Sequence, residues 1–185
     1  MEAQTALNLF KEKAAAVQAL VAEISDLGAA FDYAADLTAK QRGRVMSAFG
    51  WEGRDRAALE EACRRARVSL VQDNLRDHAD TLHTALTLAD WGIADTGSLV
   101  LDSRSEELRL ATMLAEIHIA VLPLSRLQPT SFALEDELKR LLGSPPSFLA
   151  FITGASRTAD IERVLTIGVH GPQELHILLL KDRES

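Results

Sequence analysis

Apolar residues recur at helical spacing along the first third of the chain. Intervals of three and four predict one helix from about residue 3 to Leu27, ended by Gly28, with its apolar face formed by Leu7, Phe10, Ala14, Val17, Val21 and Ile24. Two further helices are expected over residues 38–49 and 55–67. Residues 1–67 are therefore predicted to form an N-terminal helical region.

After residue 67 the spacing changes to short apolar runs separated by helical stretches. Strands are expected at 68–71, 93–95, 98–101, 117–122, 147–153 and 174–180, and helices at 106–114, 132–142 and 158–165. This alternation is typical of an α/β domain with a mostly parallel sheet covered by helices. The predicted organisation is a helical region at 1–67 and an α/β domain at 68–185.

Composition narrows the class of protein. A chain of 185 residues with 47% hydrophobic residues can bury a single core, and its one cysteine, Cys63, excludes an intrachain disulfide and an all-cysteine metal cluster. The net charge of −7 disfavours binding to nucleic acid and to anionic membranes. The longest apolar runs, such as 148–152, are too short to span a membrane, and the start lacks a basic signal region. We expect a cytoplasmic protein.

Three segments place glycine and polar residues directly after strand-like runs, where α/β sheets form ligand crevices. In the first, Asp95, Thr96 and Ser98 surround Gly97, which can adopt positive φ and let a ligand approach the backbone. Asp95 offers a carboxylate for catalysis, and the other three residues are candidate ligand contacts. The alternative interpretation is a plain hairpin turn, because these residue types favour turns.

The second segment, residues 153–162, has the pattern of a strand end, a glycine turn and a helix start. Free N–H groups at a helix N-terminus attract carboxylate or phosphate, and Arg157 could hold either group with two hydrogen bonds. The candidate ligand-binding residues are Gly154, Ser156, Arg157, Thr158 and Asp160. Alternatively, Thr158 only caps the helix and Arg157 is paired internally.

The third segment holds His170 between Val169 and Gly171 in a tight turn. An imidazole there could transfer a proton near neutral pH, which makes His170 the main catalytic candidate and Gly171 a ligand contact. An exposed turn histidine is the alternative. His118 lies within an apolar run, where a core role is expected, and no pair of histidines has the spacing of metal ligands on a helix, so no metal site is predicted.

Four motifs in order, Ala94-Asp95-Thr96-Gly97-Ser98-Leu99-Val100, Ile117-His118-Ile119-Ala120-Val121, residues 153–162 and residues 168–176, resemble those of the LUD domain family, a lactate-utilisation family of the LutC/YkgG type. The resemblance covers about residues 86–180. It departs from the family at Ala155 and near Ala115, where the family usually has prolines. It implies a fold like that of NagB, RpiA and CoA transferases, and a role in oxidising L-lactate to pyruvate with partner subunits that carry iron–sulfur clusters.

The sequence therefore predicts a cluster-free subunit or accessory protein of a lactate-utilisation system, with no cofactor of its own, that binds a small carboxylate or phosphate in a crevice at the strand ends. One alternative is an independent isomerase, hydrolase or acyl/CoA transferase that uses the same crevice. Another is a regulatory or scaffold module, because residues 40–67 carry eight basic and four acidic residues and could dock an acidic partner. An exposed helical surface is the simpler interpretation of that stretch.

Overall fold

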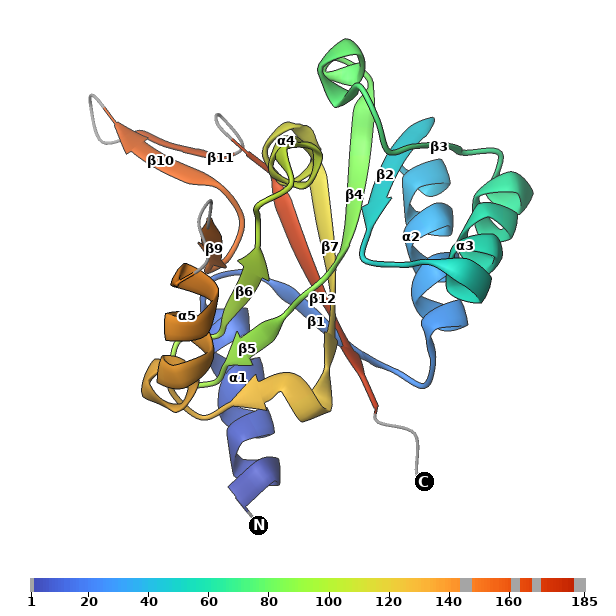
Figure 1. The fold of residues 1–185 in the computed structure, drawn as a ribbon. Helices are drawn as coiled ribbons and strands as arrows, with labels where there is room; N and C mark the ends of the chain where they lie inside the picture. The colour runs from blue at the N-terminus through green and yellow to red at the C-terminus, as the bar shows by residue number, and fades with distance from the viewer. Residues whose placement is uncertain (1, 144–147, 161–163, 168–170, 182–185) are drawn as a thin grey trace.

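A computed structural model of the chain describes residues 2–143, 148–160, 164–167 and 171–181 (Figure 1). Its centre is a six-stranded sheet in which all neighbouring strands run parallel. In spatial order the strands are β1 (Leu20–Ile24), β12 (Glu174–Leu180), β7 (Ile117–Pro123), β4 (Leu82–Leu88), β2 (Val45–Phe49) and β3 (Ser69–Val71). The predicted α/β class with a mostly parallel sheet is confirmed.

Helices cover both faces of this sheet, and their buried positions form its core. On one face α2 (Leu27–Lys40) and α3 (Gly53–Ala66) pack against apolar residues such as Met46 and Ile119. On the other face, α1 (Glu2–Ala16) packs on β12 through Phe10, and α4 (Glu106–Leu114) packs on β4. The central strands β4 and β7 are buried on both sides, which explains their nearly continuous apolar sequence.

A smaller sheet stands beside the main one (Figure 1). Its strands, in spatial order, are β8 (Leu127–Gln128), β5 (Trp91–Ile93), β6 (Ser98–Asp102) and β9 (Leu149–Ile152). The predicted meeting of two strands around Thr96 and Gly97 is confirmed by the antiparallel β5–β6 pair. The remaining elements are α5 (Glu135–Leu142), the 3₁₀ helices η1 (Leu75–His78), η2 (Leu124–Arg126) and η3 (Ser131–Leu134), and a hairpin of β10 (Arg157–Asp160) and β11 (Val164–Ile167).

The all-helical interpretation of residues 1–67 is wrong. The predicted helix 3–27 ends at Ala16 and is followed by β1, and the predicted helix 38–49 contains β2 instead. The residues that follow α1 and α2 adopt a left-handed conformation without being glycine. Gln18, after α1, has φ 63°, and Arg42, after α2, has φ 66°. Side chains disfavour that conformation, so the sequence carried no obvious stop signal. Strands from both sides of residue 67 consequently pair in one sheet.

The predicted helix 158–165 is also wrong. Residues 157–160 pair with 164–167 as an antiparallel hairpin, in which Thr158 lies opposite Thr166. β-branched residues such as Val164, Thr166 and Ile167 fit extended backbone better than helix. The anion site expected at the N-terminus of that helix therefore loses its structural basis. None of the described helices is long and apolar enough to span a membrane.

Cys63 is buried in the core between α3 and the sheet, where its thiol lies 3.5 Å from Met46 Sδ. Burial raises the pKa of this thiol to about 11. Since the thiolate is the reactive form, we expect Cys63 in the folded chain to react with a thiol reagent at least roughly tenfold more slowly than in urea-unfolded chain. Stopped-flow labelling with Ellman's reagent measures both rates, and equal rates would contradict the burial.

Candidate functional site

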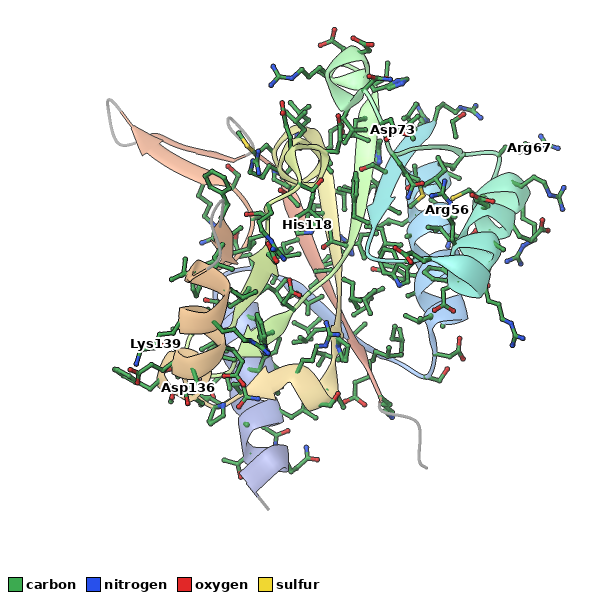
Figure 2. All side chains as sticks on the ribbon, in the orientation of Figure 1. Arg56, Arg67, Asp73, His118, Asp136 and Lys139 are labelled. Carbon is green, nitrogen blue, oxygen red and sulfur yellow. The ribbon has the colours of Figure 1, made fainter. Side chains whose placement is uncertain are left out.

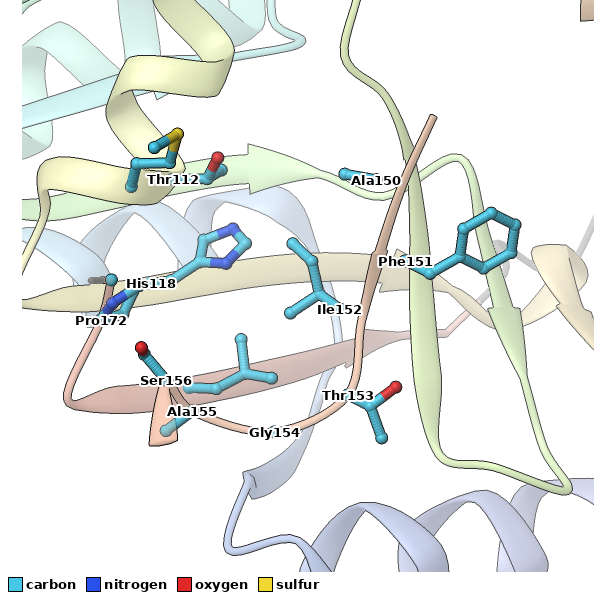
Figure 3. A pocket seen from close by; sticks show the side chains of 13 residues that line it. Thr112, His118, Ala150, Phe151, Ile152, Thr153, Gly154, Ala155, Ser156 and Pro172 are labelled. Carbon is cyan, nitrogen blue, oxygen red and sulfur yellow. The ribbon is translucent and has the colours of Figure 1, made fainter. Parts of the chain in front are cut away.

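A pocket of about 310 Å³ lies at the amino ends of β7 and β12, between α4 and β9 (Figure 3). Three of the four motifs that resemble the LUD family contribute to its wall. The lining residues are Thr112, Met113, His118, Ala150, Phe151, Ile152, Thr153, Gly154, Ala155, Ser156, Gly171, Pro172 and Leu175. We call this space the Ser156 pocket. It lies at the opposite end of the parallel strands from the carboxyl end at which the crevice was expected.

His118 is the most deeply placed polar side chain of the Ser156 pocket. It is the second residue of β7, only 1% of its surface is exposed, and its Nε2 shares a 2.8 Å hydrogen bond with Thr87 Oγ1 on β4. Among the described residues nothing hydrogen-bonds to its other ring nitrogen, Nδ1, and the ring lies among the labelled pocket residues in Figure 3. Burial lowers the pKa of His118 to about 4, so the imidazole is neutral near pH 7.

The structure brings Ser156 and Gly171 together, as the sequence predicted for their two segments. The Ser156 N–H donates a 2.8 Å hydrogen bond to the Pro172 carbonyl. A Cβ atom added to Gly171 would lie 3.3 Å from Ser156 Oγ, so glycine lets the serine hydroxyl approach this turn. Within the described chain, the Ser156 hydroxyl has no hydrogen-bond partner and is available to a ligand.

His176, another buried histidine near this end of the sheet, has a different environment. His176, on β12, faces α2, where Tyr33 Oη lies 2.7 Å from its Nδ1 and Glu174 Oε2 lies 2.8 Å from its Nε2. Both ring nitrogens are therefore satisfied within the protein. Within the described residues His118 therefore keeps a ring nitrogen for a ligand, and His176 does not. The buried His83 on β4 has its Nδ1 2.9 Å from Thr84 Oγ1 and does not line the pocket.

Three predicted ligand contacts, Gly97, Gly154 and Arg157, lie against the end of α1, and Gly154 also lines the Ser156 pocket. Cβ atoms added to Gly97 and Gly154 would lie 2.4 Å from Ala14 N and 2.6 Å from Val17 O, respectively. The Arg157 guanidinium donates a hydrogen bond to the same Val17 carbonyl. These close contacts give Gly97, Gly154 and Arg157 a structural role that requires no bound anion. The internal pairing considered as the alternative for Arg157 is thus present.

The other predicted residues lie in several places. Asp95 and Thr96 are exposed on the β5–β6 turn and do not line the Ser156 pocket, whereas the Ser98 hydroxyl lies 2.5 Å from that of Thr153 and supports its wall. Thr158 and Asp160 belong to β10 and not to a helix start. His170, the main catalytic candidate, lies outside the described residues. No group of three metal-binding side chains occurs in the described ranges.

The basic stretch 40–67 is largely neutralised where it forms α3. Exposed ion pairs join Arg56 to Glu60, Arg64 to Glu61 and, across to α2, Arg65 to Asp32. Figure 2 shows Arg56 and Arg67 on this outer surface. Arginines paired in this way favour a solvated helical surface over a docking face for an acidic partner.

The comparisons with known proteins agree with the motifs. A family model described as the LUD domain matches residues 3–180. A protein named lactate utilization protein C from Geobacillus kaustophilus is 33% identical over 111 residues, 58% of this chain and 46% of that protein. Its namesake from Halalkalibacterium halodurans is 34% identical over 114 residues, 60% and 50% of the two chains. The chain thus spans about half the length of the curated relatives it matches.

A solved structure supports the fold. The crystal structure of a DUF162 family protein from Deinococcus radiodurans superposes with a TM-score of 0.61 and covers 97% of this chain and 99% of that chain. The two sequences are 19% identical, so the similarity concerns the fold alone.

Proposed function

This chain belongs to the LUD domain family, and from that membership we propose that it acts in lactate utilisation by binding a small carboxylate in the Ser156 pocket. The observation that carries the proposal is the convergence of three family motifs on this one pocket. The names of the curated relatives supply the metabolic context. The His118 Nδ1 and the Ser156 hydroxyl, which have no hydrogen-bond partner in the described part of the chain, supply the chemistry.

Neutral donors would hold the carboxylate. The Thr87 hydroxyl would donate to Nε2 of the neutral His118 ring, which leaves Nδ1–H to donate to one carboxylate oxygen. The Ser156 hydroxyl would donate to the other oxygen, and the methyl group of lactate or pyruvate would contact Ile152 and Leu175. Neutral hydrogen bonds each contribute about 0.5–1.5 kcal/mol, so this arrangement favours weak, reversible binding.

Oxidation of lactate to pyruvate removes two electrons and two protons, and the chain needs partners to accept the electrons. We propose that iron–sulfur subunits do so, because the one cysteine is buried beside Met46 and a cluster needs several thiolates. Affinity purification of the tagged chain from cells grown on L-lactate tests this proposal. Recovery of cluster-bearing proteins supports it, and recovery of the chain alone contradicts it.

We expect L-lactate and pyruvate to raise the melting temperature of the purified chain, since a ligand that binds only the folded state stabilises it. Ser156→Ala should weaken the affinity roughly threefold to tenfold, the effect of one lost hydrogen bond. Ser131→Ala, at an exposed serine outside the pocket, is the matched control and should leave the affinity unchanged. Equal affinities of wild type and Ser156→Ala would exclude the serine from the site.

Growth on L-lactate tests the cellular role. In a deletion strain the wild-type gene should restore growth, Ser131→Leu should restore it equally, and Ser156→Leu should fail, because its side chain fills the pocket. Circular dichroism shows whether Ser156→Leu is folded, and Ser156→Ala provides a milder change. Full growth without the gene would refute the role in lactate utilisation.

Turnover of acyl-CoA or sugar phosphates by the purified chain alone would favour the alternative function, an independent isomerase, hydrolase or acyl/CoA transferase.

A further inference from the structure

A second pocket, of about 380 Å³, opens at the carboxyl ends of β2 and β4. Parallel α/β sheets commonly bind ligands at this end. The Ser156 pocket lies at the other end of the sheet, so the two spaces are separate. None of the residues singled out in the sequence lines the second pocket, which we call the Asp90 pocket.

The polar wall of the Asp90 pocket contains one carboxylate, Asp90, and one guanidinium, Arg126, that form no direct ion pair within the described residues. Asp90 Oδ2 accepts a 2.6 Å hydrogen bond from the Asp102 backbone N–H, and Arg126 Nη1 donates a 3.1 Å hydrogen bond to the Ala89 carbonyl. These backbone contacts fix the orientation of both side chains. In the described part of the chain no ion pair joins Asp90 to Arg126, and each keeps polar atoms for a ligand.

The other two charged side chains of the pocket neutralise each other. Arg104 donates hydrogen bonds to Asp102 Oδ2 from both Nε and Nη2, at 2.9 Å and 2.5 Å. The charges left for a ligand are therefore one carboxylate and one guanidinium. Burial raises the pKa of Asp90, as expected for a carboxylate that lacks a direct cationic partner.

The apolar part of the wall comes from Phe49, Leu88, Leu101 and Leu108, and Gly50 and Ser105 complete the lining. We propose that the Asp90 pocket binds a small zwitterion of the α-amino acid type with an apolar side chain, independently of the proposed function. The ligand carboxylate pairs with Arg126, its ammonium group pairs with Asp90, and its side chain contacts the leucines. A simple carboxylate would satisfy only Arg126 and would be repelled by Asp90.

Three probes with one carbon skeleton test the charge pattern: L-leucine, L-2-hydroxy-4-methylpentanoate and 4-methylpentanoate. At the carbon beside the carboxylate, leucine carries an ammonium group, the hydroxy acid a hydroxyl group and 4-methylpentanoate a hydrogen atom. Calorimetric titration of the full chain should show leucine binding at least tenfold more tightly than the hydroxy acid, with the fatty acid weakest. Charge-assisted hydrogen bonds are about twice as strong as neutral ones, which sets this order.

Asp90→Asn should remove the advantage of leucine, while its amide oxygen can still accept the Asp102 N–H. Arg126→Gln should weaken the binding of every probe that the wild type binds, and Ser131→Ala, at an exposed serine outside both pockets, should change none of these affinities. No leucine binding to the wild type, equal affinities for leucine and the hydroxy acid, or an unchanged leucine affinity in Asp90→Asn would each overturn the proposal. These outcomes leave the tests of the Ser156 pocket unaffected.

Discussion

Replacing Gly97 with alanine lowers the free energy of unfolding by roughly 2–4 kcal/mol, the sum of left-handed backbone strain and overpacking. Gly97 has φ 65°, and an added Cβ would lie 2.4 Å from Ala14 N and 2.7 Å from Lys13 C. Both atoms are backbone of α1, so the helix itself must move. Urea denaturation measures the loss, and the melting temperature should fall by roughly 5–15 °C.

Gly53→Ala is the matched control. Gly53 has a similar φ of 56°, but an added Cβ there meets no atom within 4 Å. It should therefore show only the backbone strain, about 1 kcal/mol. If both variants lose the same stability, the contact between the β5–β6 turn and α1 contributes nothing, and the structural explanation of Gly97 is wrong.

The second large effect concerns the pH dependence of stability through His118. Its pKa is about 4 in the folded chain, because of burial, and about 6.5 in the unfolded chain. Between these values the unfolded state binds more protons, so stability falls as the pH drops from 6.5 towards 4. Lowering the pH from 7.5 to 5.0 should reduce the free energy of unfolding by about 2 kcal/mol through His118 alone.

His118→Gln removes the titrating group while its amide can still bond to Thr87. The stability that the wild type loses between pH 7.5 and 5.0 should exceed the loss of this variant by about 2 kcal/mol. Ser131→Ala, at an exposed serine that does not titrate, should retain the wild-type dependence. A His118→Gln variant with an unchanged pH dependence would show that His118 titrates normally and is not buried as described.

The central strand β4 is absent from the sequence prediction, because the buried polar residues His83, Thr84 and Thr87 interrupt its apolar run. The other strands of the main sheet after residue 67 were predictable, because buried parallel strands leave short apolar runs between helical periods. Two strands before residue 67 were not. β1 continues the three-and-four spacing of α1 through Val21 and Ile24, and α1 ends at Ala16 without a glycine to mark the change. The β10–β11 hairpin was mistaken for a helix because Thr158 resembled an N-cap.

The candidate site was predictable only in part. The two glycine-containing turns that hold Ser156 and Gly171 lie next to each other, as the sequence predicts. The sequence predicts Arg157 as an anion ligand, because it cannot show that the side chain reaches the Val17 carbonyl. The sequence predicts a core role for His118, since its burial follows from its apolar neighbours. Whether its second nitrogen is satisfied depends on tertiary contacts that the sequence does not reveal.

The most direct test of the carboxylate site is the pKa of His118, followed by NMR of its imidazole with and without saturating pyruvate. A carboxylate bound at Nδ1 stabilises the imidazolium, so pyruvate should raise this pKa by about one unit or more. L-Lactate should act in the same direction, and Ser156→Leu should abolish the shift. Pyruvate that binds saturably while the pKa of His118 stays near its ligand-free value would contradict the Ser156 pocket as the binding site.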